Sequence, residues 1–384
     1  MLHKKILLVI FLSLFILMGC KEEKNIDQTI TSTLEEQNNS YAEGFKITDY
    51  KTHKILTISN PWPEAENSYN YALLPKASEP KLAINENDFE GLITTPVQNI
   101  VVTSTTHIPA LELLGVEQTL VGFPGTDYIS SEKTRTRIDN EQVRELGNNE
   151  GINTEVLLEL QPDVVVAFGV DGTNKSMEVI EKAGIPVIYN GDWVEKSPLA
   201  KAEWIKFFGA LYNKEKEAEA IFTQIETDYL EAKKTASKAT SKPTVLCGAM
   251  HKDVWYLPNG TSPEAQFLKD ANTNYLWSDT KESGSIALSF EAVFEKGKNA
   301  ELWLSPSYYK SYDDLKKSNN HYTKFNAFQN KTIYTFSNTT GKTGGVLYYE
   351  LGISRPDLVL KDMIKICHPE LLTEYTPTFF KPLN

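Results

Sequence analysis

The sequence predicts an α/β protein of two Rossmann-like lobes, each built on a mainly parallel sheet, joined by one long helix. Short apolar strands alternate with helices in residues 99–189 and again in residues 244–366, a rhythm that produces right-handed βαβ units. A short internal repeat relates the halves, because residues 153–166 align with 289–302. Each copy has a capping residue, a Glu two positions later, an apolar helix face, a polar turn and a strand.

The long helix is predicted from residues 198–234, which lie between the two halves. This stretch has no proline after its first residue and is dense in Ala, Glu, Lys and Leu, which are good helix formers. As a single helix, its 37 residues would span roughly 55 Å. A helix of this length typically connects bodies, so we expect two lobes that face each other across a cleft.

The first lobe is expected to begin with β-hairpins between Phe45 and Ala83, interrupted by the Pro61-Trp62-Pro63 turn. The run 164–168 is fully apolar, as in a sheet covered on both faces. Gly115 ends one expected helix and Asn153 caps another. The expected strands are 99–103, 119–123, 164–168 and 186–189, and the expected helices are 108–114, 154–160 and 174–183.

The second lobe shows the same alternation. Ser262 and Pro263 have the order of a capping residue and a first helical residue. Residues 253–257 with the following Pro258-Asn259-Gly260 indicate a hairpin. The expected strands are 244–248, 301–304 and 332–336, and the expected helices are 262–271, 289–296 and 355–366.

The N-terminus has the features of a targeting segment. Lys4 and Lys5 precede the apolar run Ile6–Leu17, which is too short to span a bilayer. Leu17-Met18-Gly19-Cys20 resembles a bacterial lipobox, so Cys20 is the expected lipidation site; the alternative is an ordinary signal peptide with an incidental Cys. The expected organisation is a signal peptide 1–19, a flexible tether 20–43, an N-terminal lobe 44–197, a spine helix 198–237 and a C-terminal lobe 238–384.

The amino-acid composition narrows the classes of molecule that the protein is expected to bind. The 384 residues are 41% hydrophobic, which is enough for sizeable cores, and the net charge of −12 argues against general binding to nucleic acid or anionic lipid. Cys247 and Cys367 leave two alternatives open, a disulfide or two buried thiols.

Several motifs resemble the periplasmic substrate-binding proteins that serve ABC importers of iron complexes and cobalamin. The resemblance covers about residues 97–369, and the matching motifs are Ile100–Thr103, Leu113–Gly115, Leu158–Ala167 (LELQPDVVVA), Ala183–Val187 (AGIPV) and Ser354–Asp357 (SRPD). It implies the helical-backbone periplasmic-binding fold, with the long helix as a rigid spine, and a transport protein rather than an enzyme.

The resemblance also implies that Glu155 and Glu291 dock onto arginines of a membrane permease. Both are expected in the first turn of a surface helix, at matching positions of the repeat, where the helix dipole favours a carboxylate. The alternative is a simple helix N-terminal charge without a partner.

Candidate ligand-binding residues follow from topology, because ligands of open α/β sheets sit beyond the carboxyl ends of strands and between domains. Aromatic rings recur at these positions and suit a bulky, flat or macrocyclic ligand, although packing within the core is the alternative for each. The candidates are Thr106, His107, Tyr128, Phe168, Trp193, His251, Trp255, Tyr308, Tyr309 and Lys342.

Other site chemistry finds little support in the sequence. His107 and His251 have no close-spaced His or Cys partner, so we predict neither a protein-held metal nor a cofactor. Gly341-Lys342-Thr343 is not a phosphate loop, because Phe336 occupies the position of the required first Gly. No Gly-x-Ser-x-Gly elbow occurs. An α/β enzyme that acts on a metal cofactor, and a purely structural lipoprotein, are the rival classes.

The sequence therefore predicts a monomeric, lipid-anchored receptor in the periplasm that captures an iron–siderophore or related metal chelate and delivers it to an inner-membrane ABC permease. Cobalamin and haem are the alternative ligands. The chain has only four arginines, at positions 135, 137, 144 and 355. Anionic catecholate or citrate complexes usually need an Arg cluster. Three of the arginines are close together in the first lobe, which leaves an anion site as an alternative, but a neutral hydroxamate complex or cobalamin fits the sequence better.

Overall fold

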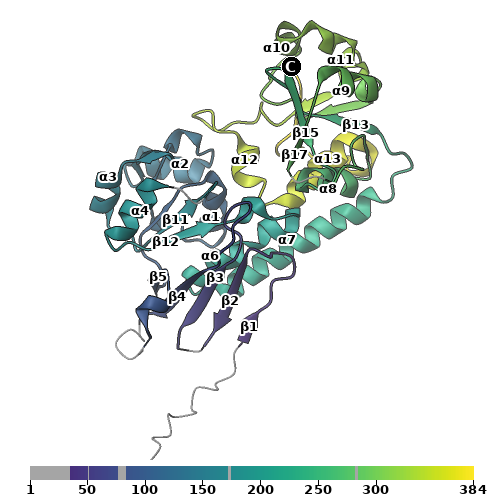
Figure 1. Cartoon of the computed structure of the whole chain (residues 1–384). Coiled ribbons are helices and arrows are strands. Elements are labelled where there is room, and N and C mark those ends of the chain that lie inside the picture. Colours follow the sequence, from purple (N-terminus) through teal and green to yellow (C-terminus); the bar gives the residue numbers. More distant parts are fainter. Residues whose placement is uncertain (1–34, 51, 77–83, 172–173, 282–283) are drawn as a thin grey trace, which may run out of the picture.

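The computed structural model describes residues 35–50, 52–76, 84–171, 174–281 and 284–384. Cys20 and the expected signal peptide lie outside these residues. Two lobes stand side by side and a long helix, α7, runs beneath both (Figure 1). This arrangement confirms the predicted fold class.

The N-terminal lobe contains a five-stranded parallel sheet in the order β12-β11-β6-β7-β8. Val164 and Val166 of β11 pack into one core cluster, whereas Val165 packs into another on the opposite face. The apolar run is thus covered on both faces, as predicted. The strands are β6 (Ile100–Val102), β7 (Leu120–Phe123), β8 (Arg144–Glu145), β11 (Val164–Phe168) and β12 (Val187–Asn190), with helices α1 (Ile108–Leu113), α2 (Glu132–Asp139), α3 (Thr154–Leu160) and α4 (Lys175–Lys182).

A second five-stranded sheet precedes this lobe, in the order β1 to β5. Its first four strands are antiparallel neighbours, as hairpins require, but β4 and β5 are parallel. A two-stranded ribbon of β9 (Gly147–Asn148) and β10 (Gly151–Ile152) precedes α3. The sheet strands are β1 (Glu35–Gln37), β2 (Phe45–Asp49), β3 (Lys54–Ile58), β4 (Tyr69–Pro75) and β5 (Gly91–Thr95).

The structure describes residues 35–43 of the expected flexible tether, and these residues belong to the folded body. Residues 35–37 already form β1. The fully buried Glu203 carboxylate then accepts hydrogen bonds of 2.8 Å from the backbone N–H groups of Ser40, Tyr41 and Ala42. The last residues of the predicted tether are therefore fixed to the body, because a long-range carboxylate satisfies their backbone donors.

The C-terminal lobe contains a sheet in the order β16-β13-β18-β19-β20, parallel except for β20. A small antiparallel sheet, β14-β15-β17, lies beside it. The strands are β13 (Thr244–Cys247), β14 (Ala249–His251), β15 (Val254–Pro258), β16 (Asn274–Tyr275), β17 (Ser285–Leu288), β18 (Leu302–Leu304), β19 (Ile333–Thr335) and β20 (Lys381–Pro382).

The helices of this lobe mostly follow the prediction. Ser262 caps α8 and Ser289 caps α9, each through its side chain. The hairpin turn, however, lies at Lys252, which has a φ of 55°, and not after Pro258. The helices are α8 (Pro263–Asp270), α9 (Phe290–Gly297), α10 (Tyr312–Ser318), α11 (Asn326–Gln329), α12 (Leu347–Leu351) and α13 (Pro356–Cys367).

The connecting stretch is three helices and not one. After α5 (Pro198–Glu203) and α6 (Ile205–Leu211), the chain turns at Asn213, whose φ is 55°, and α7 (Glu215–Ala236) begins. A Cβ atom on Gly209 would lie 2.6 Å from the Cβ of Ala218. This glycine therefore allows α6 to pack closely against α7.

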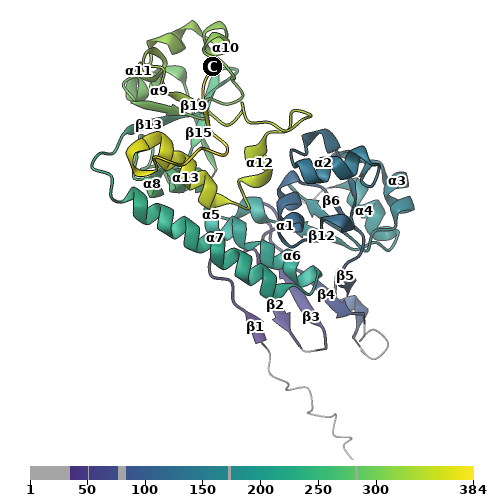
Figure 2. The ribbon, with the colours of Figure 1, turned by 180° about the vertical axis from the view of Figure 1, so that it is seen from behind.

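Helix α7 keeps the role of a spine although its 22 residues span only about 33 Å. Phe222 and Ile225 belong to the core of the N-terminal lobe, whereas Tyr229 and Ala232 belong to the core of the C-terminal lobe. Seen from behind, α7 runs along both lobes (Figure 2). One helix is thus part of two cores.

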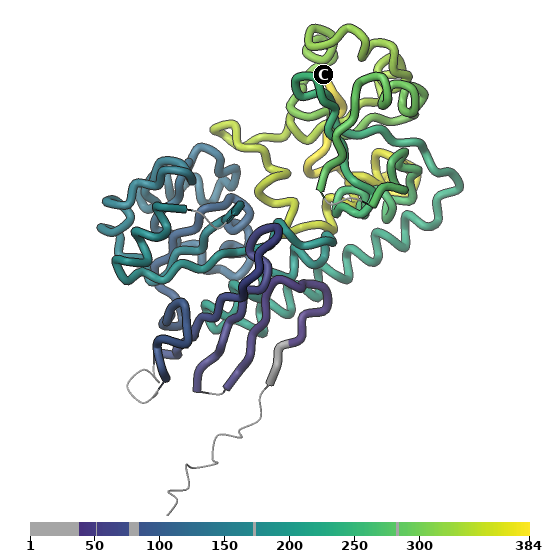
Figure 3. Tube along the Cα trace, viewed as in Figure 1, coloured from purple at the N-terminus to yellow at the C-terminus, as the bar shows by residue number. Residues whose placement is uncertain are grey.

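Residues 339–352, which we call the bridging segment, pass from the C-terminal lobe to the N-terminal lobe (Figure 3). The Thr343 hydroxyl donates to the carbonyl of Asp127 at 2.8 Å. A Cβ atom on Gly345 would come within 2.0 Å of the Tyr128 carbonyl oxygen, so only glycine fits there. The bridging segment, which includes α12 (Leu347–Leu351), therefore connects the two lobes in addition to α7.

Candidate functional site

The carboxyl ends of β13, β18 and β19 open into a cavity of about 430 Å³, which we call the aromatic cavity. Its position agrees with the rule that ligands of parallel sheets lie beyond the ends of strands. The lining side chains that could contact a ligand are His251, Tyr256, Glu264, Tyr308, Phe336, Tyr348 and Tyr349.

The rings of this cavity form one connected group. Phe336 stacks on Tyr348 with a centroid distance of 4.3 Å and meets Tyr349 edge to face at 5.3 Å. Tyr349 in turn lies 6.5 Å from Tyr308, which is 70% exposed. The stack of Phe336 on Tyr348 fixes the wall of the aromatic cavity. The phenols of Tyr308 and Tyr349 remain available to a ligand.

A second hollow of about 300 Å³ adjoins the aromatic cavity and lies between the lobes. Tyr348, Tyr349 and Glu264 line both hollows, whereas Thr106 and Lys201 line only the interlobe one. Helix α12 therefore presents its two tyrosines to both spaces, and a ligand in the aromatic cavity would approach the N-terminal lobe there.

The N-terminal side of the interlobe hollow is a buried polar cluster. Thr106 donates a 3.1 Å hydrogen bond to Asp192. Burial raises the pKa of Asp192 to about 6, although the positive charge of Lys201 opposes the rise. The Lys201 ammonium also donates to the carbonyl of Trp193 at 2.9 Å, and the Trp193 ring packs against Phe168 at 5.5 Å. The sequence-predicted Thr106, Phe168 and Trp193 thus lie close together.

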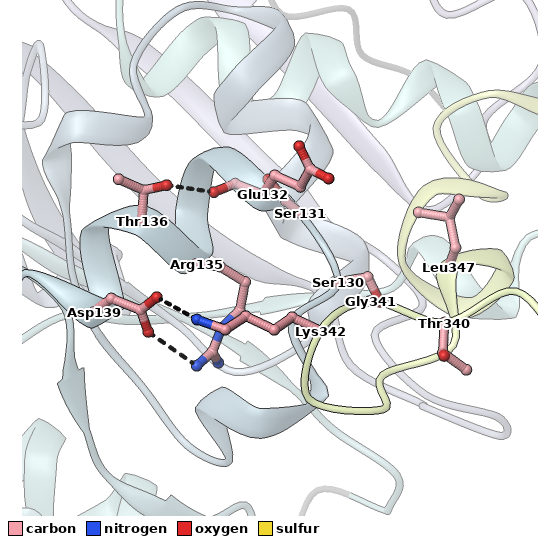
Figure 4. Close-up of a pocket in the computed structure, with 10 residues that line it drawn as sticks. All are labelled: Ser130, Ser131, Glu132, Arg135, Thr136, Asp139, Thr340, Gly341, Lys342 and Leu347. Atoms are coloured by element: carbon pink, nitrogen blue, oxygen red, sulfur yellow. Dashed lines mark hydrogen bonds and ion pairs between the residues drawn. The ribbon is translucent and has the colours of Figure 1, made fainter.

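A third hollow, of about 670 Å³, separates α2 from the bridging segment. Three of its charged groups, Arg135, Asp139 and Lys342, pair with one another (Figure 4). Asp139 accepts from Lys342 of the bridging segment at 3.0 Å and lies 3.6 Å from Arg135. Tyr128, another predicted residue, lines a neighbouring hollow and is 72% exposed. Lys342 and Tyr128 therefore line hollows other than the aromatic cavity.

Two of the predicted ligand-binding residues, His107 and Trp255, are core residues, and a third, Tyr309, is partly buried against the core. His107 is 0% exposed, and its ring packs 5.7 Å from Phe208; burial lowers its pKa to about 3. Trp255 is also fully buried, and its indole N–H donates to the carbonyl of Cys247. Tyr309 packs against Tyr322 at 6.2 Å. None of these three lines the aromatic cavity.

The chain neighbours of Trp255 and Tyr309 line the aromatic cavity. Tyr256 lines it, and Trp255 points to the opposite face of β15, because successive strand residues alternate. Tyr308 lines it, whereas Tyr309 does not. Strand alternation predicts from the sequence that Trp255 and Tyr256 face opposite ways, but only the packing decides which of them lines the cavity. Tyr348 and Tyr349 follow no predicted strand, and only the folded bridging segment brings them to the cavity.

The two glutamates predicted for docking are exposed at matching places. Glu155 lies in the first turn of α3 and Glu291 in the first turn of α9. Asn153 and Ser289 cap these helices, as the internal repeat predicts. Neither carboxylate forms an ion pair with another residue in the described ranges.

The part of the chain that the structure describes contains no group of three or more His, Cys, Asp or Glu side chains that could hold a metal ion. No helix within the same residues is both long and apolar enough to cross a bilayer. Cys247 and Cys367 are buried free thiols, which decides between the two alternatives left by the sequence.

Comparison with known proteins is consistent with this geometry. An uncharacterized lipoprotein of Methanocaldococcus jannaschii (MJ0878) is 25% identical, over 96% of this chain and 93% of its own.

Among solved structures, a possible iron-binding periplasmic solute-binding protein of Staphylococcus epidermidis aligns with a TM-score of 0.57 and 19% identity, over 71% of this chain and 100% of its own. A periplasmic heme binding protein of Pseudomonas aeruginosa aligns with a TM-score of 0.55 and 17% identity, over 75% and 98% of the two chains. At these identities the likeness shows the fold. The family model described as periplasmic binding protein matches residues 100–340, and the chain therefore belongs to this family of non-enzymatic, substrate-binding transport components.

Proposed function

We propose that this protein is the lipid-anchored receptor of an ABC importer and that it holds an iron–siderophore or related metal chelate in the aromatic cavity. The observation that carries the proposal is the group of tyrosines at the carboxyl ends of the C-terminal strands, with Tyr308 and Tyr349 exposed to a ligand. Flat or bulky chelates offer the apolar surface that such rings bind.

Two further features support the proposal. The lipobox-like Leu17–Cys20 stands at the end of an apolar run, and two relatives from Methanocaldococcus jannaschii are named lipoproteins. Glu155 and Glu291, one on each lobe, offer a pair of carboxylates to a two-fold symmetric permease. The anchor would keep the receptor beside that permease.

The test is a binding titration with purified protein in which Cys20 is replaced by Ser and the preceding residues are removed. Ferrichrome, ferrioxamine B, haemin and cyanocobalamin are titrated while intrinsic fluorescence is recorded. We expect saturable quenching by at least one chelate. Replacing Tyr308 or Tyr349 with Ala should weaken that binding about fivefold to tenfold, the contribution of one aromatic contact.

Tyr50→Ala is the matched control, because Tyr50 follows β2 in the N-terminal sheet and lines none of the hollows described above. It should leave the affinity unchanged. If none of the four compounds binds, or if the cavity variants bind as well as the control, the proposal is wrong.

Haem is the second candidate, and one observation favours it. His251 and Tyr308 line the same cavity, and imidazole and phenolate are both axial ligands of haem iron in proteins. Haemin binding that shifts the Soret band, and loses the shift in His251→Ala or Tyr308→Phe, would select this ligand.

A further inference from the structure

The aromatic cavity carries an unusual balance of charge. Glu264 is the one carboxylate among its described lining residues, and none of them is Lys or Arg. Glu264 lies exposed in the first turn of α8 and lines the adjoining interlobe hollow as well. A ligand that enters from either side therefore meets a negative charge.

The phenols of the cavity add no second charge. Burial is the main cause that raises the pKa of both Tyr348 and Tyr349, and the nearby Glu264 carboxylate reinforces the rise. Neutral phenols can donate hydrogen bonds to ligand oxygens. Their ring faces are electron-rich and attract cations.

The cations that line the neighbouring hollows are already engaged. Lys201, across the interlobe hollow, donates to the Trp193 carbonyl and its charge acts on the buried Asp192. Lys342 and Arg135, beyond the bridging segment, share Asp139. A polyanionic ligand in the aromatic cavity would thus face Glu264, and no Lys or Arg among the described lining residues would compensate that charge.

We propose that the aromatic cavity selects metal chelates that present a neutral or positively charged face and discriminates against polyanionic ones, an inference that rests on the function proposed above. Trihydroxamate ferric complexes satisfy this condition, because three hydroxamate groups neutralise the charge of ferric iron. Some of these complexes also carry a free ammonium group. Tricatecholate complexes carry a net triple negative charge and would need the basic cluster that this cavity lacks.

The experiment compares ferrioxamine B, which is cationic, ferrichrome, which is neutral, and ferric enterobactin, which is trianionic, in direct titrations at low salt. We expect the first two to bind and the third to bind at least tenfold more weakly. Glu264→Gln should weaken ferrioxamine B binding about threefold to fivefold, as expected for one exposed charge pair. Its effect on ferrichrome should stay below twofold, and added salt should reduce the difference.

Glu370→Gln is the matched control, since Glu370 is also exposed and also follows a proline in the first turn of a helix. It should change none of the affinities. Enterobactin binding as tight as that of ferrioxamine B overturns the charge inference and leaves the receptor function standing. Equal losses for the cationic and neutral chelates in Glu264→Gln also overturn it. Failure of all three chelates, haemin and cyanocobalamin to bind removes the proposed function and the inference with it.

Discussion

The Glu350 carboxylate of the C-terminal lobe accepts a 2.8 Å hydrogen bond from the backbone N–H of Ser131, the residue that caps α2 in the N-terminal lobe. The adjacent N–H of Ser130 donates to the other carboxylate oxygen. An N–H at the start of a helix has no partner within that helix, so Glu350 satisfies a donor of the opposite lobe. Because Tyr349 is its neighbour, α12 connects the aromatic cavity directly to the N-terminal lobe.

This contact predicts a pH dependence of stability. Burial raises the pKa of Glu350 from 4.5 to about 7, against the opposing effect of the Ser130 and Ser131 N–H groups. The folded protein therefore binds a proton that the unfolded chain has lost between these pH values. The stability that Glu350 contributes is complete below pH 4.5 and is lost as the pH rises through 7.

Urea denaturation at several pH values compares the wild-type protein with Glu350→Gln. We expect the unfolding free energy of the wild-type protein, relative to that of the variant, to change by up to about 3 kcal/mol from pH 5 to pH 8. The wild-type protein should lose stability relative to the variant as the pH rises. At pH 5 the variant should be less stable by about 1–3 kcal/mol, because the Gln amide offers one acceptor to two N–H donors. Parallel pH profiles for the two proteins would exclude this role for Glu350.

The shared spine predicts that the two lobes unfold together. Phe222 is fully buried on the part of α7 that belongs to the N-terminal core. Phe222→Ala should cost about 3–5 kcal/mol, and hydrogen exchange should show reduced protection in both lobes, since α7 is part of both cores. Leu230→Ala, on the exposed side of α7, should cost less than about 0.5 kcal/mol. Loss of protection confined to the N-terminal lobe would contradict this prediction.

The docking proposal predicts a charge-dependent interaction with the permease. The double variant Glu155→Arg and Glu291→Arg should abolish complex formation with the permease in membranes or nanodiscs and should leave chelate affinity unchanged. Each single variant should weaken docking, because one lobe keeps its carboxylate. Glu159→Arg with Glu295→Arg, exposed positions on the same helices, is the control. Normal docking of the first double variant would rule out the assigned role.

Much of the fold could be predicted because its signals are local. The apolar run Val164–Phe168 forms β11 with the predicted bounds. Asn153, Ser262 and Ser289 cap the helices that they were expected to cap, since capping depends on a side chain and a backbone N–H only three residues away. The repeat and the family motifs identified the two lobes for the same reason.

The site was less predictable because it depends on which face of an element is buried. Trp255 and Tyr256 are adjacent aromatics, and only the packing of β15 decides that Tyr256 lines the cavity. His107 follows a predicted strand, yet it packs against Phe208 of α6, a helix about 100 residues later in the sequence.

The sequence by itself determined the α/β class, the two-lobed order and the helix caps, because these follow from periodicity and from contacts near in the chain. Its short motifs carried the resemblance to the family. Only the tertiary structure decided that the connecting stretch breaks at Asn213, that Glu203 fixes residues 40–42, and that α12 lies between the lobes. Each of these features depends on a close approach or a buried partner distant in the chain, and hydrophobic pattern carries no information about such partners.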